Sequence, residues 1–146
     1  LDGTRSFIAR DGQFTINIGL IQMHKPVFGV MLVPVTGALY WASEGDGAYR
    51  QIGQEAVQRI QTRKPHRDGY DVVTSKSHAS PATDGWLQKY KIRSRVKAGS
   101  ALKLLTVAEG GADLYPRVGR TMEWDTAAGQ CILEEAGGYF MTLDGK

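Results

Sequence analysis

Two acidic residues that lie far apart in the sequence each stand at a backbone corner suited to holding a divalent metal ion. Asp2 lies in Leu1-Asp2-Gly3-Thr4, and Asp125 lies in Trp124-Asp125-Thr126-Ala127-Ala128-Gly129. Each has a plain alternative, because Asp-Gly pairs are common in turns and Asp is a preferred helix N-cap. Two such corners in one chain still favour metal-assisted phosphate chemistry.

The residues that follow Asp125 predict a helix over 126–136 whose first turn is nearly without side chains. Ala127, Ala128 and Gly129 would allow a metal–phosphate group to come close to the helix N-terminus. Exposed N–H groups and the helix dipole favour anions there. We expect Trp124 to be a core anchor beside this site rather than a stacking platform.

Further polar residues could bind a phosphorylated ligand, although each also has an ordinary structural explanation. His78 lies in Ser75-Lys76-Ser77-His78, between an expected strand and an expected helix, where a histidine is usually just solvated. Lys103 and Arg117 could equally be exposed residues that favour solubility. In the functional alternative, these two cations neutralise a second phosphate.

Composition excludes several classes of protein. The 146 residues are 42% hydrophobic, enough for one domain with a real core and too many for a disordered chain. No apolar run is long enough to cross a membrane. The formal charge of +3 favours an anionic partner, but the basic residues are spread out, which argues against a nucleic-acid polymer. Cys131 is the single cysteine, so no internal disulfide can form, and we expect a reducing, cytoplasmic compartment. Cys131 falls on the apolar side of the helix expected over 126–136, so we expect it to be buried.

Strands are expected to precede a region in which strands and helices alternate. Apolar periodicity and intervening turn residues predict strands over 14–20, 27–33, 38–42 and 48–50, with a brief strand near Ile60. Further strands are expected over 71–74, 92–96, 113–115 and 139–142, and helices over 80–90, 101–108 and 126–136. Ser80 and Ser100 are expected to be helix N-caps. This order predicts an α/β (α+β) fold built as a layered sandwich.

Together these segments resemble the lithium-sensitive inositol monophosphatase superfamily of metal-dependent phosphatases. Leu1-Asp2-Gly3-Thr4 is similar to the end of its Asp-Pro-(Leu/Ile)-Asp-Gly-Thr motif. Residues 124–129, followed by Glu135-Ala136-Gly137-Gly138, are similar to its second motif. The resemblance covers essentially the whole chain. It implies an αβαβα sandwich of the sugar-phosphatase type, incomplete here, with residues 1–146 forming a single partial domain.

Within the superfamily, the chain resembles the 3′(2′),5′-bisphosphate nucleotidases of the CysQ type. Residues 5–18 and Tyr115-Pro116-Arg117 match their segments, and Ser75-Lys76-Ser77-His78 is similar to Ser-Arg-Ser-His. Gly99-Ser100-Ala101-Leu102-Lys103 is similar to Gly-Ser-Ser-Leu-Lys. The resemblance implies a hydrolase of sulfur metabolism that removes the 3′-phosphate from adenosine 3′,5′-bisphosphate, giving AMP and phosphate. Lys76 and Ala101 depart from the pattern, which leaves the fine contacts open.

The resemblance also implies a role for each site residue. Two or three Mg²⁺ ions would be bound by the Leu1 carbonyl, Asp2 and Asp125, with Asp2 bridging two of them. Asp2 and Thr4 would be catalytic, Thr4 by helping to orient the attacking water. The residues expected to contact the substrate are Gly3, Thr4, Ser75, His78, Ser100, Lys103, Arg117 and Asp125.

Two other functions stay open at this point. One is an inositol monophosphatase or sugar-phosphate phosphatase on the same fold, and the other is a non-catalytic phosphate- or partner-binding module. The sequence leaves open a homodimer and a peripheral association with the inner membrane. The superfamily's upstream Glu-Glu pair and first motif Asp are not in this sequence. We therefore expect the chain to be part of a longer active protein and to be inactive alone.

Overall fold

The first half of the chain forms a five-stranded antiparallel sheet. The computed structural model describes residues 1–75 and 80–145. The strands are neighbours in sequence order: β1 (Ile16–Gln22), β2 (Lys25–Val33), β3 (Ala38–Ser43), β4 (Gly47–Ile52) and β5 (Gln58–Ile60). This confirms the expected antiparallel meander, including the brief strand at Ile60. β1 begins two residues later than expected, because Thr15 is paired with Asp2 instead of β2.

The second half contains a parallel pair of strands, β6 (Tyr70–Ser75) and β7 (Ile92–Ala98). Parallel neighbours need a crossover, and α2 (Pro81–Leu87) provides it. The Ser80 side chain accepts a hydrogen bond from Thr83 N, so the predicted N-cap is confirmed. α2 ends three residues before the expected Tyr90, where a turn leads into β7.

Two predicted strands do not form. The one over 113–115 is reduced to a single bridge between Leu114 and Val72, because Pro116 follows and has no N–H to continue the ladder. The one over 139–142 is wrong: these residues are irregular, and no strand lies beside them in the described ranges. The Tyr139 side chain is 83% exposed, so the apolar pattern there does not mark burial.

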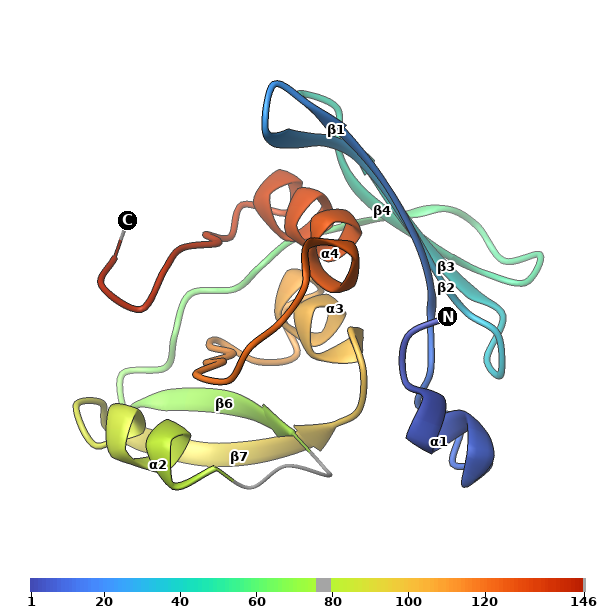
Figure 1. The fold of residues 1–146 in the computed structure, drawn as a ribbon. Coiled ribbons are helices and arrows are strands. Elements are labelled where there is room, and N and C mark those ends of the chain that lie inside the picture. The colour runs from blue at the N-terminus through green and yellow to red at the C-terminus, as the bar shows by residue number, and fades with distance from the viewer. Residues whose placement is uncertain (76–79, 146) are drawn as a thin grey trace.

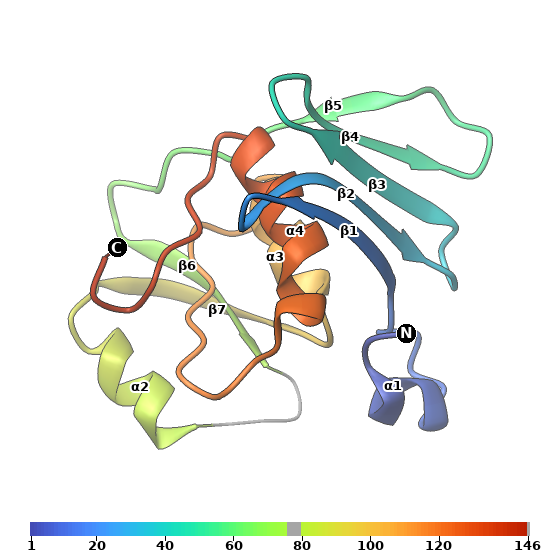
Figure 2. The same cartoon turned by 45° about the horizontal axis from the view of Figure 1, so that its top comes forward.

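Helices separate the two sheets. α3 (Leu102–Ala108) and α4 (Glu123–Glu135) lie between the five-stranded sheet and the β6–β7 pair, while α2 covers the far side of that pair (Figure 1). The layers confirm the predicted α/β sandwich. α1 (Thr4–Ile8), which was not predicted, lies by the N-terminus beyond the end of β1 (Figure 2). In the described part of the chain, no helix is both long and apolar enough to span a membrane.

The outer face of the five-stranded sheet has no helix over it in the described part of the chain. Successive outward positions of β1 are apolar and exposed, with Ile18 at 62% and Leu20 at 58%. Val30 and Trp41 continue the row that Ile18 begins across the paired strands. Of the five layers implied by the resemblance, the described residues form four.

The small residues of α4 serve close packing. Ala127 and Ala128 are buried against the inner face of the first sheet, where Gly19 and Gly29 lie opposite them. Gly129 faces Leu104 of α3. The interpretation of these residues as a bare, ligand-accessible helix entrance is therefore wrong, because their surfaces are already filled by protein. Their size lets α4 approach both the sheet and α3.

A methyl group at position 29 would test this contact. An added Cβ on Gly29 would lie 2.4 Å from the Ala128 carbonyl oxygen, a backbone atom that cannot rotate away. We expect Gly29→Ala to lower the free energy of unfolding by about 1–3 kcal/mol in urea denaturation. Gly85→Ala is the matched control, because Gly85 has open space around it. An equal loss of stability in both variants would contradict the packing argument.

Candidate functional site

Asp2 is held by the strand that follows it. Its backbone exchanges two hydrogen bonds with Thr15, with Asp2 N to Thr15 O at 2.8 Å and Thr15 N to Asp2 O at 2.9 Å. Gly3 has φ of +97°, which turns the chain from this bridge into α1. The predicted Asp-Gly corner is therefore present. Thr4, the first residue of α1, is exposed beside it.

The Asp2 carboxylate is bound by a segment almost a hundred residues away. Its Oδ2 accepts hydrogen bonds from the Ser100 hydroxyl and, at 2.7 Å, from Ala101 N. The Ser100 Oγ also lies 3.2 Å from Thr15 Oγ1. Ser100 adopts a left-handed conformation with φ of +48°. The prediction that Ser100 caps α3 is wrong, because its side chain turns to Asp2 and Ala101 takes the N-cap position.

Gln13 was not among the expected site residues, yet it supports this arrangement. Its side-chain Oε1 accepts a hydrogen bond from Gly99 N at 2.6 Å. This bond ties the residue before Ser100 to the segment that leads into β1. A glutamine between an expected loop and an expected strand gives no local signal of such a role.

Asp125 lies inside the first turn of α4. The helix begins at Glu123, and Met122 is the N-cap residue without a side-chain cap hydrogen bond. The capping explanation for Asp125 is therefore wrong. Its side chain is half-buried and has no hydrogen bond to the described residues, so the carboxylate is available to a ligand. Trp124 is 71% exposed, which contradicts its predicted role as a core anchor.

Lys103 is buried beside Asp2 rather than displayed on the surface. Its side chain is only 4% exposed, and Nζ donates a hydrogen bond to the Ser100 carbonyl at 2.5 Å. Nζ also lies 5.4 Å from the centre of the Tyr115 ring. Burial, reinforced by the nearby Arg117 charge and opposed by Asp2, lowers the pKa of Lys103 to about 8. The solubility explanation is therefore wrong.

The phenol of Tyr115 lies within electrostatic range of both acidic residues, Asp2 and Asp125. Burial raises the pKa of its phenol, a hydrogen bond from Arg117 opposes the shift, and the charges of Asp2 and Asp125 add to it. Both carboxylates act on the same hydroxyl, so they lie within electrostatic range of one site. Four of the expected site residues, Asp2, Lys103, Arg117 and Asp125, therefore lie within electrostatic range of Tyr115, which was not among the expected residues.

The donor atoms at this site are oxygens, the type of ligand that magnesium prefers. Mg²⁺ prefers oxygen ligands and is commonly held by one or two carboxylates, with waters and substrate phosphates completing its coordination. Asp2 and Asp125 offer two carboxylates, and Leu1 precedes Asp2 with an adjacent carbonyl. Among the described residues, no group of three or more His, Cys, Asp or Glu side chains could hold a metal ion. The chain can therefore supply part of a magnesium site.

An ion-pair network positions the segment that carries Tyr115. Arg63 Nε lies 2.7 Å from Asp113 Oδ1, and Asp113 Oδ2 accepts a hydrogen bond from Asp71 N at 2.7 Å. Hydrogen bonds from Arg93 and Ser94 hold the pKa of Asp71 far below its usual range. These contacts fix residue 113 against β6, so that residues 114–117 run on toward the site.

A cavity of about 760 Å³ is lined in part by Tyr115 and Arg117. Ser75 lines it, as expected for a substrate contact, and His78 lies outside the described residues. The cavity also has cationic residues that were not among the expected substrate contacts. The sequence does carry a signal for those of β7, because basic residues stand at every second position there (Arg93, Arg95 and Lys97), which puts them on one face of the strand. The cationic residues that line the cavity are Arg95, Lys97, Arg117 and Arg120.

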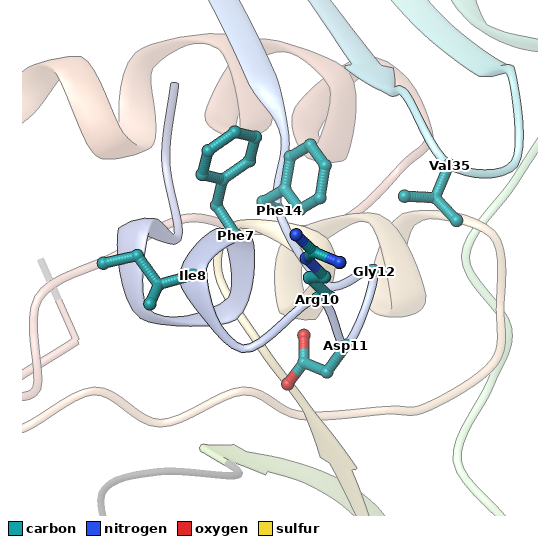
Figure 3. A pocket seen from close by; sticks show the side chains of 7 residues that line it. All are labelled: Phe7, Ile8, Arg10, Asp11, Gly12, Phe14 and Val35. Atoms are coloured by element: carbon teal, nitrogen blue, oxygen red, sulfur yellow. The ribbon is translucent and has the colours of Figure 1, made fainter.

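A second cavity, of about 550 Å³, lies between α1 and the β2–β3 turn. Phe7 and Phe14 form an edge-to-face pair with ring centres 5.2 Å apart, and Val35 stands across from them (Figure 3). Arg10 and Asp11 are the charged side chains at its edge. None of the predicted site residues lines it, so we do not assign it to the candidate site.

The chain matches a known protein family over its whole length. Residues 1–146 match the model of the inositol monophosphatase family. The chain is 41% identical to the 3′(2′),5′-bisphosphate nucleotidase CysQ of Salmonella typhimurium, over 100% of this chain and 58% of that protein. It is 40% identical, with the same coverage, to the CysQ of Escherichia coli strain K12. The chain thus spans just over half the length of these curated relatives.

Solved structures share the arrangement. The crystal structure of CysQ from Bacteroides thetaiotaomicron superposes with a TM-score of 0.83 at 42% identity, covering 94% of this chain and 57% of that one. SuhB of Mycobacterium tuberculosis has a TM-score of 0.80 at 26% identity, covering 93% and 57%. The sandwich of the present chain is therefore the fold of these proteins over the shared part.

The environment of Lys103 predicts how it titrates. In metal-free buffer, NMR of its side chain should give a midpoint near pH 8. Arg117→Gln should raise this pKa, since it removes a repelling cation, and Asp2→Asn should lower it, since it removes an attracting anion. The folded state binds this proton less tightly than the unfolded chain, so the unfolding free energy should rise with pH above about 8. A midpoint at the ordinary lysine value would contradict the burial argument.

Proposed function

Because this chain belongs to the inositol monophosphatase family, we propose that it carries part of the active site of a 3′(2′),5′-bisphosphate nucleotidase. The reaction would be removal of the 3′-phosphate from adenosine 3′,5′-bisphosphate, giving AMP and phosphate. The observation that carries the proposal is the contact of the Asp2 carboxylate with Ser100 and Ala101, which joins the first motif to the Gly99–Lys103 segment. The identity to named bisphosphate nucleotidases supports the same substrate.

The magnesium ions of this proposal, two or three in number, would be held by the Leu1 carbonyl, Asp2 and Asp125. Bound Mg²⁺ lowers the pKa of a water and neutralises phosphate oxygens in an in-line displacement. Asp2 is prepared for this role, because Ser100 and Ala101 N fix one carboxylate oxygen and leave the other free of hydrogen bonds to the described residues. Asp125 would contribute its carboxylate from the first turn of α4.

The other residues bind and orient the substrate. Gly3 and Thr4 would hold the scissile phosphate at the turn into α1, and the exposed Thr4 hydroxyl would orient the attacking water. Lys103 is positioned by Ser100 and would add a buried positive charge beside Asp2. Ser75 and Arg117 line the larger cavity and would contact the nucleotide. His78 remains a predicted contact.

The partner in this proposal is a small phosphorylated nucleotide, and we place the protein in the cytoplasm. Homodimer formation and peripheral contact with the inner membrane remain untested predictions from the sequence.

The proposal predicts a selective effect at Asp125. Phosphate release from adenosine 3′,5′-bisphosphate by the complete protein should require Mg²⁺, and Asp125→Asn should lower kcat/KM by more than about 100-fold. Glu123→Gln is the matched control, because it removes one carboxylate from the same helix turn. We expect the control to retain nearly full activity.

The substrate comparison separates the alternatives. Faster release from inositol 1-phosphate than from the nucleotide would make the protein an inositol phosphatase. No Mg²⁺-dependent release from either substrate would sink the enzymatic proposal and leave a binding module. Equal losses in Asp125→Asn and Glu123→Gln would remove the special role of Asp125.

A further inference from the structure

The hydrogen bonds that orient the Asp2 carboxylate come from a strained backbone segment. Ser100 has φ of +48°, a conformation that a non-glycine residue keeps only where its surroundings enforce it. From this conformation the Ser100 hydroxyl and the Ala101 N–H both donate to Asp2 Oδ2. The Ser100 carbonyl accepts the hydrogen bond from Lys103 Nζ at 2.5 Å. The conformation of residue 100 therefore sets both the Asp2 carboxylate and the buried ammonium group of Lys103.

Two side chains just before β1 contact this strained segment. Gln13 Oε1 accepts a hydrogen bond from Gly99 N at 2.6 Å, and Thr15 Oγ1 lies 3.2 Å from Ser100 Oγ. Gly99 is buried, and a buried N–H that loses its acceptor is costly. Gln13 therefore constrains where the backbone of residue 99 lies, while Thr15 constrains the side chain of residue 100.

The direction of the Thr15 hydrogen bond follows from the number of available protons. The Ser100 hydroxyl has one proton, and it bonds to two oxygens of Asp2, the carboxylate Oδ2 and, at 3.1 Å, the backbone carbonyl. Because this proton points to Asp2, Thr15 Oγ1 is the donor to Ser100 Oγ. Thr15 is fully buried, which shields the bond from solvent. The donors thus run from Thr15 through Ser100 to Asp2.

Close packing keeps Gln13 at this position. A Cβ added to Gly99 would lie 2.9 Å from both Cβ and Oε1 of Gln13, and one added to Gly3 would lie 3.0 Å from Gln13 O. The Gln13 N–H donates to Asp11 Oδ1 at 3.0 Å. The two glycines therefore let residues 2–3 and 99–101 converge on Gln13, whose own backbone is held by Asp11.

We propose that Gln13 and Thr15 are positioning residues for the reaction, which act on the Asp2 carboxylate through Gly99 and Ser100. This inference rests on the proposed function and deepens it, because Asp2 is a magnesium ligand in that proposal. Residues that orient a metal ligand from behind typically change metal affinity or activity by about 10–100-fold when they are replaced.

Hydrogen exchange in the metal-free protein tests the positioning contact without requiring turnover. Gln13→Met keeps an unbranched side chain and removes the amide oxygen. In EDTA buffer, we expect the Ala101 N–H, which donates to Asp2, to exchange about 3- to 10-fold faster in this variant, while the amides of α4 keep their rates. An unchanged rate at Ala101, or the same acceleration in α4, would overturn the proposal. Thr15→Val gives the same readout if Gln13→Met does not fold.

Metal binding and catalysis by the complete protein test the consequence for the site. We expect Gln13→Met and Thr15→Val each to weaken Mg²⁺ binding in titration calorimetry by about tenfold or more, and to raise the Mg²⁺ concentration needed for half-maximal phosphate release. Gln13→Glu and Thr15→Ser should restore both Mg²⁺ binding and slow exchange at Ala101, because a carboxylate still accepts from Gly99 N and serine keeps the hydroxyl. Conservative variants as weak as Gln13→Met would contradict this role.

A matched control and the metal-free measurement separate this inference from the proposed function. Gln22→Ala removes an exposed glutamine at the far end of β1 and should change neither exchange at Ala101 nor Mg²⁺ binding. Faster exchange with unchanged Mg²⁺ affinity in Gln13→Met would overturn the positioning role. A wild-type protein that binds Mg²⁺ but releases no phosphate would defeat the nucleotidase proposal alone, since the exchange and affinity comparisons still decide the roles of Gln13 and Thr15.

Discussion

The close approach of α4 to the first sheet controls where both acidic corners lie. At Gly29 the helix backbone comes so near that a single added carbon would lie 2.4 Å from the Ala128 carbonyl oxygen. This contact sets the position of α4 over β1 and β2, and Asp125 stands in the first turn of that helix. β1 in turn follows the bridge between Thr15 and Asp2. Residues without bulky side chains therefore determine how far apart the two carboxylates are.

The hydrogen bond from Ser100 to Asp2, the second contact that positions the site, requires a strained backbone at Ser100. Ser100 is held at φ of +48°, a conformation that costs a non-glycine residue about 1–3 kcal/mol. In this conformation its hydroxyl reaches Asp2, and the next N–H donates to the same carboxylate oxygen. Hydrogen bonds to a charged acceptor are among the stronger ones, so they can offset the strain. Strained residues of this kind are characteristic of functional sites.

The features that were predictable from the sequence depend on local signals. The strands of the five-stranded meander, the tight turns between them and the Ser80 cap are encoded within a few residues, and these features are found. Ser100 and Asp125 also carry a local capping signal, but tertiary contacts or helix position override it. The burial of Lys103 and the exposure of Trp124 depend on which elements pack beside them. The motif resemblance located these residues without revealing their environments.

The fold arranges charge in a way that the net charge of the chain does not reveal. A formal charge of +3 is small, and the basic residues are scattered in sequence. Folding gathers Lys97 from a strand and Arg117 and Arg120 from a loop into the lining of one cavity. Tyr115 lines the same cavity and lies within electrostatic range of the carboxylates of Asp2 and Asp125. Groups of opposite charge are thus brought to the two ends of one short loop segment, whereas the sequence shows only their small sum.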